Sequence, residues 1–249
     1  SGSSEGESGG TILLTSGSSK TGMSGRIAIS TGDATNGISS GGMEFATGST
    51  AVGDAGTIHI ATGNSAEGNS GSITSGAGSS SKFVGGGVSL SAGNSDSATG
   101  GHIKLLAGKG MYSGSLHLGS FVHSTERGSS GSVIVASGQS YNGKSGNIQL
   151  TSGPSISEAG SIMLNSGVSN SEVGGSISIN AGGSTFSTGG SIMAMSGGSS
   201  QSTSGHVAIT SGQSEVGMTG SIQLRTGNAG DGATGDLISK TGDSMDSVS

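Results

Sequence analysis

A fifteen-residue repeat is the feature of this sequence that most constrains its fold. From Gly160 to Gly227 the blocks read GSIMLNSGVSNSEVG, GSISINAGGSTFSTG, GSIMAMSGGSSQSTS, GHVAITSGQSEVGMT and GSIQLRTG. Each block has Gly at position one, aliphatic residues at positions three and five, a small residue at position seven and Gly at position eight. Seven mostly polar residues follow. A short fixed period with one strand-like pattern per block is typical of a solenoid.

The same block covers the whole sequence, so the sequence predicts a single repeat array over residues 1–249. Most blocks start fifteen residues apart, and the few spacings that differ by one or two fit insertions and deletions in turns. The block starts are Gly10, Gly25, Gly41, Gly56, Gly71, Gly86, Gly101, Gly114, Gly131, Gly146, Gly160, Gly175, Gly190, Gly205, Gly220 and Gly235.

The residues at positions three and five predict one strand per block. A spacing of two places both side chains on the same face of a strand, whereas a helix would separate them by about 200° around its axis. We therefore expect these pairs to point inward and form a thin apolar core. The pairs are Ile12/Leu14, Ile27/Ile29, Met43/Phe45, Ile58/Ile60, Val88/Leu90, Ile103/Leu105, Leu116/Leu118, Val133/Val135, Ile148/Leu150, Ile162/Leu164, Ile177/Ile179, Val207/Ile209 and Ile222/Leu224.

Three other positions carry expectations about the turns. Gly at position eight predicts a turn with positive φ or a close approach of two backbones. The small residue at position seven is expected to face inward, and the frequent Ser at position ten is expected to lie on a second, shorter extended segment. The block at Gly71 departs from the template, because GSITSG (71–76) predicts a strand two residues short.

Together these patterns predict an all-β fold: a flattened parallel β-helix, or β-solenoid, of about 16 rungs of about 15 residues, without helices. Analogy with most β-helices makes it right-handed. Two buried aliphatic side chains contribute roughly 3–6 kcal/mol per rung, while ordering fifteen residues costs on the order of 20 kcal/mol. Hydrogen bonds between neighbouring rungs must supply the difference, so a lone block is expected to be unfolded.

Composition excludes several classes of protein. The chain has 54 Gly among 249 residues but only 10% charged residues and one Pro, which argues against both a disordered linker and collagen. With no Cys it can form no disulfide or thiolate zinc site. Its net charge of −6, without a basic cluster, argues against nucleic acid as a partner, and no apolar run reaches the length of a membrane span.

No group of residues predicts catalysis, cofactor binding or a metal site, and we expect no enzyme. The five histidines (59, 102, 117, 123 and 206) never share a column on adjacent blocks. Glu158 and Glu172 nearly share one, and the segment 227–236 resembles a calcium-binding turn, but neither pattern repeats as a calcium-dependent β-roll requires. Phe121 to Arg127 predicts a protruding loop, either a contact or a tolerated bulge.

Block forms such as GGSISIN and GSIQLRTG resemble the Gly/Ser-rich repeats of large secreted algal proteins of the cell surface, the cell wall and flagellar (mastigoneme-type) hairs. The resemblance covers the whole chain and rests on a low-complexity repeat. It implies an extracellular structural part and carries over no functional residues.

These observations predict a non-catalytic extracellular rod, a shaft or filament building block of a cell-surface fibre, hair or wall. Its expected partners are adjoining repeats or copies of itself end to end, lateral filament partners or glycans. Because the chain starts in the middle of a block, ends at position fifteen of the last one and offers no cap at either end, we expect an excerpt of a longer array or ends covered by identical or related subunits. The alternative is an ice-binding or adhesive solenoid that presents an ordered Ser/Thr-rich face. A polysaccharide-cleaving β-helix ranks third, because the turns are too short to build a cleft.

Overall fold

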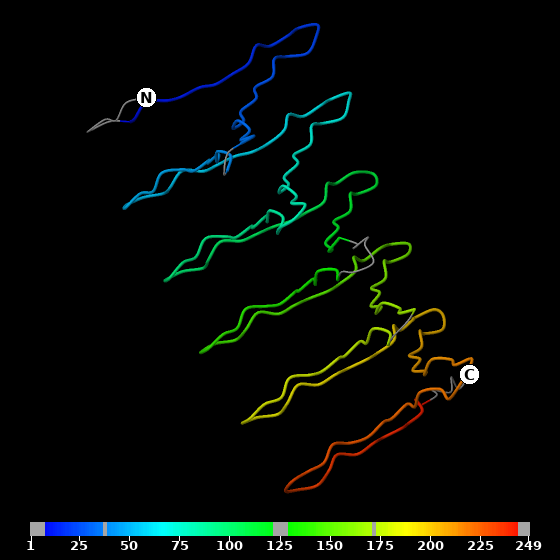
Figure 1. The fold of residues 1–249 in the computed structure, drawn as a ribbon. Coiled ribbons are helices and arrows are strands. Elements are labelled where there is room, and N and C mark those ends of the chain that lie inside the picture. Colours follow the sequence, from blue (N-terminus) through cyan, green and yellow to red (C-terminus); the bar gives the residue numbers. More distant parts are fainter. Residues whose placement is uncertain (1–7, 37–38, 122–128, 171–172, 244–249) are drawn as a thin grey trace. The chain divides into compact units, whose positions relative to one another are not determined.

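The computed structural model describes residues 8–36, 39–121, 129–170 and 173–243. In these ranges the backbone forms neither helix nor strand, and the chain is drawn throughout as extended segments joined by turns (Figure 1). The chain divides into two compact units, Ser1–Leu118 and Gly119–Ser249. The same local pattern recurs in both units, repeat by repeat.

Each repeat consists of an extended arm, positions one to eight, and a loop, positions nine to fifteen. In the best-formed repeats the loop is closed by one backbone hydrogen bond, from the N–H of the next repeat's first Gly to the C=O of the Gly at position eight. These closures are Gly25 to Gly17, Gly86 to Gly78, Gly101 to Gly93, Gly175 to Gly167, Gly190 to Gly182 and Gly205 to Gly197, at 2.8–2.9 Å. A shorter loop is closed by Gly114 and Gly108 at 3.0 Å.

A hydroxyl at position ten holds the bend inside the loop. In the loop after Gly182, the Ser184 Oγ accepts the backbone N–H of Ser187 at 3.0 Å. Because this is the usual way in which Ser stabilises a local turn, the loops are set by residues close in sequence. The same bond, from an N–H three residues on, is made by Ser19, Ser65, Ser80, Ser95, Ser140 and Ser199. The expectation that position ten lies on a second extended wall is therefore wrong.

The closed loops set the course of the chain. Because the closure brings position eight beside the start of the next repeat, the next arm leaves from the point where the previous arm ended. Figure 1 shows the result within each unit, where extended arms alternate with bends and the chain advances through similar turns. Among the described residues the backbone bonds are loop closures, and none joins two arms along their length.

The predicted parallel β-solenoid is therefore wrong. It required every arm to run in the same direction and to pair its backbone with the arms of the rungs above and below. The described residues contain no strand, and their backbone hydrogen bonds close loops instead of pairing one arm with the next. The physical reason is local: a nine-residue loop with a Ser-held bend and one backbone bond forms within a single repeat, whereas a parallel ladder needs contacts between repeats.

The predicted apolar core is also absent. No described residue is buried. Of the described residues, two are half-buried, Ala92 and Ser214, and the others are exposed. The chain exposes 25,478 Å² of surface to solvent. A compact protein of this mass exposes about 9,700 Å² and a fully extended chain about 34,000 Å². The aliphatic pairs do not pack together inside the chain, so their burial does not stabilise it.

The repeat that begins at Gly71 has the ordinary length. The C=O of Gly78 accepts the N–H of Gly86, and the Ser80 Oγ accepts the N–H of Phe83 at 3.0 Å. These bonds place Gly78, rather than Gly76, at position eight. The sequence interpretation of a strand two residues short was wrong, because it took the first Gly after Ile73 as the end of the arm. The true departure is Ser75 in place of an aliphatic residue at position five.

Candidate functional site

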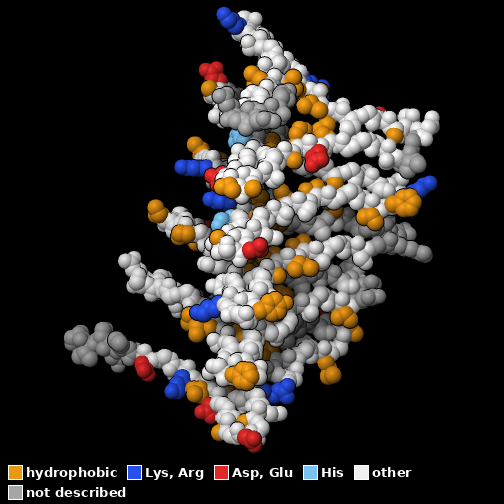
Figure 2. Space-filling model, turned by 90° about the vertical axis from the view of Figure 1, so that its left-hand side faces the viewer, with side chains coloured by type: hydrophobic (Ala, Val, Ile, Leu, Met, Phe, Trp, Pro, Cys, Tyr) orange, Lys and Arg blue, Asp and Glu red, His pale blue; other side chains and the backbone are white. Residues whose placement is uncertain are grey.

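The arms present the one surface that recurs in every repeat. Their side chains at position three are 46–62% exposed in the inner repeats, and those at position five are 54–75% exposed. Large apolar side chains in the loops are exposed to a much higher degree, such as Val168 at 94% and Phe186 at 99%. Figure 2 shows hydrophobic side chains standing on the visible face between polar and backbone atoms. The arms therefore carry a partly sheltered apolar column that remains open to solvent.

The shelter of position three comes from neighbouring repeats. Ile12, in the first repeat, is 82% exposed, and Leu237, in the last, is 69% exposed. In the repeats between them the exposure falls to about half, as for Ile27 at 46% and Ile222 at 50%. A side chain at this position is thus better covered when it has repeats on both sides. What partly covers an arm in this chain is another part of the same repeat structure.

In the repeats with a closed loop, the Gly at position one is required by a close approach of two backbones. A Cβ built on Gly175 would lie 3.1 Å from the Ser166 Cβ and 3.2 Å from the N and O of Gly167. Gly101 and Gly86 meet positions seven and eight of the preceding repeat in the same way. Any larger residue would push the two ends of the loop apart. In these repeats position one is Gly because the loop closes there, whereas a Cβ on Gly220 or Gly235 would meet no atom within 4 Å.

At position eight, by contrast, no neighbouring atom of the chain excludes a side chain larger than Gly. A Cβ built at position eight meets no atom within 4 Å in any of the repeats that have Gly there. The glycines with positive φ in the described ranges are Gly53, Gly217 and Gly232, all at position thirteen. The expected positive φ at position eight is therefore wrong, and the close backbone approach that does occur there, as between Gly167 and Gly175, leaves the Cβ direction of position eight open. The repeats with this open Gly end their arms at Gly17, Gly32, Gly48, Gly63, Gly78, Gly93, Gly108, Gly138, Gly153, Gly167, Gly182, Gly197, Gly212, Gly227 and Gly242.

Hydroxyls at position seven bond to the chain itself in two repeats. The Ser16 Oγ donates to the C=O of Gly25 at 2.8 Å, and the Thr62 Oγ1 donates to the C=O of Gly71 at 3.1 Å. The Ser16 bond lies beside the backbone closure from Gly25 to Gly17, and the Thr62 bond joins the two ends of its own loop. The position-seven hydroxyl thus acts as part of the loop and not as a free donor on an ordered face.

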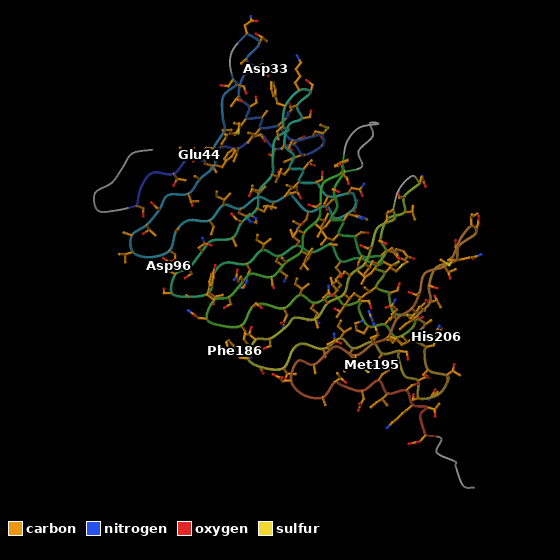
Figure 3. All side chains as sticks on the ribbon, turned by 60° about the horizontal axis from the view of Figure 1, so that its bottom comes forward. Asp33, Glu44, Asp96, Phe186, Met195 and His206 are labelled. Carbon is orange, nitrogen blue, oxygen red and sulfur yellow. The ribbon has the colours of Figure 1, made fainter. Side chains whose placement is uncertain are left out.

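The described His, Asp and Glu side chains that could bind a metal ion or act in catalysis do not gather at one place. Among the described residues no group of three or more His, Asp or Glu side chains is placed to hold a metal ion. In Figure 3 Asp33, Glu44 and Asp96 lie apart from one another, and Met195 and His206 come from successive arms. Every described His is exposed (His59, His102, His117 and His206). Glu172, His123 and the protruding segment that contains it lie outside the described residues, so the stacked Glu158/Glu172 pair is not described.

One shallow hollow is lined by four consecutive residues, Arg225, Thr226, Gly227 and Asn228. It overlaps the start of the segment 227–236, which was considered as a calcium-binding turn. No second segment contributes to it, and its lining brings one cation and no carboxylate. Groups that come from a single stretch of exposed chain do not form an enclosed binding site.

The arm surface is the candidate site that the described residues offer. In the described ranges there is no helix long and apolar enough to cross a bilayer. The aliphatic columns at positions three and five and the open glycines at position eight recur together along both units. The search of protein families, the search of curated proteins and the search of solved structures each found no match for this chain.

Proposed function

We propose that this chain is a non-catalytic structural element of an extracellular fibre, flagellar hair or wall, in which it acts as a repeating filament component. The observation that carries this proposal is the exposure of one apolar surface in repeat after repeat. A surface repeated at fifteen-residue intervals is suited to building a periodic assembly, because every repeat makes the same contact.

The surroundings of the polar residues support a structural role over a catalytic one. Catalysis requires acid, base or nucleophile side chains held within hydrogen-bond reach of one another in a water-excluding cavity. In the described part of the chain all titratable side chains are exposed and none is gathered in an enclosed cavity. The residue type varies freely at positions four and six of the arm, as in Gln149, Met163 and Arg225. Positions one, three and eight stay nearly uniform from repeat to repeat.

The extracellular location rests on the resemblance to secreted algal repeat proteins and on composition. With 10% charged residues and many Ser and Thr, the loops are polar without being strongly charged, which suits a wettable surface in a fibre. An ice-binding role has less support. It needs a flat, ordered row of hydroxyls, whereas the described arms form no sheet and the hydroxyls of Ser16 and Thr62 bond to their own chain.

Electron microscopy of the native material tests this proposal. An antibody raised against the chain should decorate fibres, hairs or wall layers outside intact cells, at regular intervals along each fibre. The same antibody should not need permeabilised cells in order to bind. Labelling confined to the cell interior, or dispersed single molecules with no fibre, would contradict the structural role.

A further inference from the structure

We infer that the arm faces dock on a second copy of this chain, repeat against repeat, through the aliphatic columns at positions three and five and the open glycines at position eight. This inference rests on the proposed structural function and names its partner and its contact surface. It is carried by three observations: the amount of exposed apolar surface, the part of the chain that already shelters it, and the glycines that nothing within the chain explains.

The exposed surface is far larger than a stable interface needs. The chain exposes 25,478 Å² where a compact protein of its mass exposes about 9,700 Å². A specific, stable complex buries about 1,200–2,000 Å² in total. Covering a few arms would therefore suffice for a stable contact, and the aliphatic side chains at positions three and five would supply its apolar part.

The exposure of the side chains at position three supports a second copy of the chain as the partner. Position three is less exposed in the inner repeats than at Ile12 and Leu237, so its cover increases where repeats of the same kind lie on both sides in the sequence. A second copy offers the same groups from outside. Because its arms carry the same fifteen-residue period, each arm contact made once can be made again in every repeat.

Charge does not oppose the pairing of like chains. The net charge of −6 is spread over 249 residues, and only 10% of the residues are charged. The arms carry charges of both signs, as with Arg26, Glu44, Lys104 and Arg225. A partner of strong single charge gains little on such a surface, whereas a second copy meets a nearly neutral, apolar face.

The glycines at position eight fit a contact from outside the chain. Their backbone conformation suits any residue and their Cβ direction is open, yet the position is Gly in all repeats except the one that has Phe121. A side chain there would hold a partner's backbone or side chains away from the arm. Gly is therefore expected at this position when a second chain packs closely against the end of the arm.

Sedimentation velocity over a range of concentrations tests the aliphatic columns. The triple variant I148S/I162S/I177S removes three position-three side chains. The matched control I156S/V168S/F186S removes three large apolar side chains that lie in loops and are more exposed. Since no described side chain is buried, both variants should keep their loops. We expect the dissociation constant for self-association to rise at least about a hundredfold in the first and less than about threefold in the control.

Two pairs of neighbouring glycines test position eight. Gly182 and Gly197 stand at position eight, and Gly183 and Gly198 stand one residue later with equally open Cβ directions and no positive φ. In the isolated chain G182A/G197A and G183A/G198A should behave alike. In self-association the first should be weaker by about tenfold or more and the second nearly unchanged, because overpacking at a close contact is costly.

The results of these experiments can contradict the docking surface and the proposed function independently of each other. A wild-type chain that stays monomeric at all concentrations, or equal effects of both members of each variant pair, overturns the docking surface even if the native material is fibrous. Self-association that responds to the variants as expected, in a protein found only inside cells, supports the docking surface and overturns the extracellular function.

Discussion

The backbone N–H of Gly190 donates to the carbonyl oxygen of Gly182 at 2.8 Å, and this single bond closes a loop of nine residues. The bond forms where Gly190 lies so close to Gly182 that an added Cβ would meet its N and O at 3.4 Å. The same relationship recurs along the chain between the last Gly of one arm and the first Gly of the next. The loop, and not a ladder between arms, is the structural unit of this protein.

The loop closure predicts that the two glycine columns respond differently to substitution. In Gly175→Ala the new Cβ would meet Ser166 and the backbone of Gly167 at 3.1–3.2 Å, so the hydrogen bond at 2.9 Å must lengthen or break. A net loss of about 1 kcal/mol corresponds to hydrogen exchange about five times faster at the amide of residue 175. Gly167→Ala, whose Cβ direction is open, is the control and should leave that amide unchanged. Equal acceleration in both variants would contradict the assignment.

The Ser at position ten predicts a second local effect. Ser184→Ala removes the acceptor of the Ser187 N–H, a bond of 3.0 Å. Loss of a turn-holding hydroxyl costs about 1 kcal/mol locally. Nuclear magnetic resonance should show faster amide exchange at Ser187 and changed shifts from residues 184 to 187. Thr188→Ala, in the same loop, should leave them as they are, and an unchanged Ser187 in Ser184→Ala would show that the hydroxyl does not hold the bend.

Self-association predicts a specific pattern of protection from trypsin. Arg26, Lys104 and Arg225 lie in arms, whereas Lys20, Lys82 and Lys144 lie in loops. All six are exposed in the single chain, so dilute monomer should be cut at both sets. At concentrations where copies associate, cleavage after the arm residues should slow by about tenfold or more, while cleavage after the loop residues continues. Mass spectrometry of the peptides measures both rates, and uniform protection would argue against arm-to-arm docking.

The apolar character of the arms predicts how solvent conditions act on association. Sulfate should strengthen it and cooling should weaken it, because both act on apolar burial. Sodium chloride between low and physiological concentrations should change the dissociation constant less than about threefold, since few charged pairs can be screened. Sedimentation velocity in matched buffers measures this. A steep loss of association with sodium chloride would indicate a contact made by charges instead.

The sequence by itself determined the repeat unit and most of its boundaries. The fifteen-residue spacing predicts where arms and loops alternate, and Gly175 and Gly190 stand at the closures. At Gly71 the pattern misled, because Gly76 and Gly78 both fit the end of an arm and only the bond from Gly86 to Gly78 distinguishes them. The role of Ser184 was missed as well, although a Ser followed by polar residues at the start of a loop is the usual sign of a Ser-held turn.

What only the tertiary structure decided is whether the arms pair with one another and what surrounds their side chains. Alternation such as Ile177 and Ile179 indicates which residues share a face, but a face can be covered by the next repeat, by another chain or by water. The period is equally compatible with arms that pair their backbones and with arms that remain unpaired. Among the described residues the backbone bond between positions eight and one is local, so it forms without any contact between arms. The aliphatic columns are therefore exposed on the single chain.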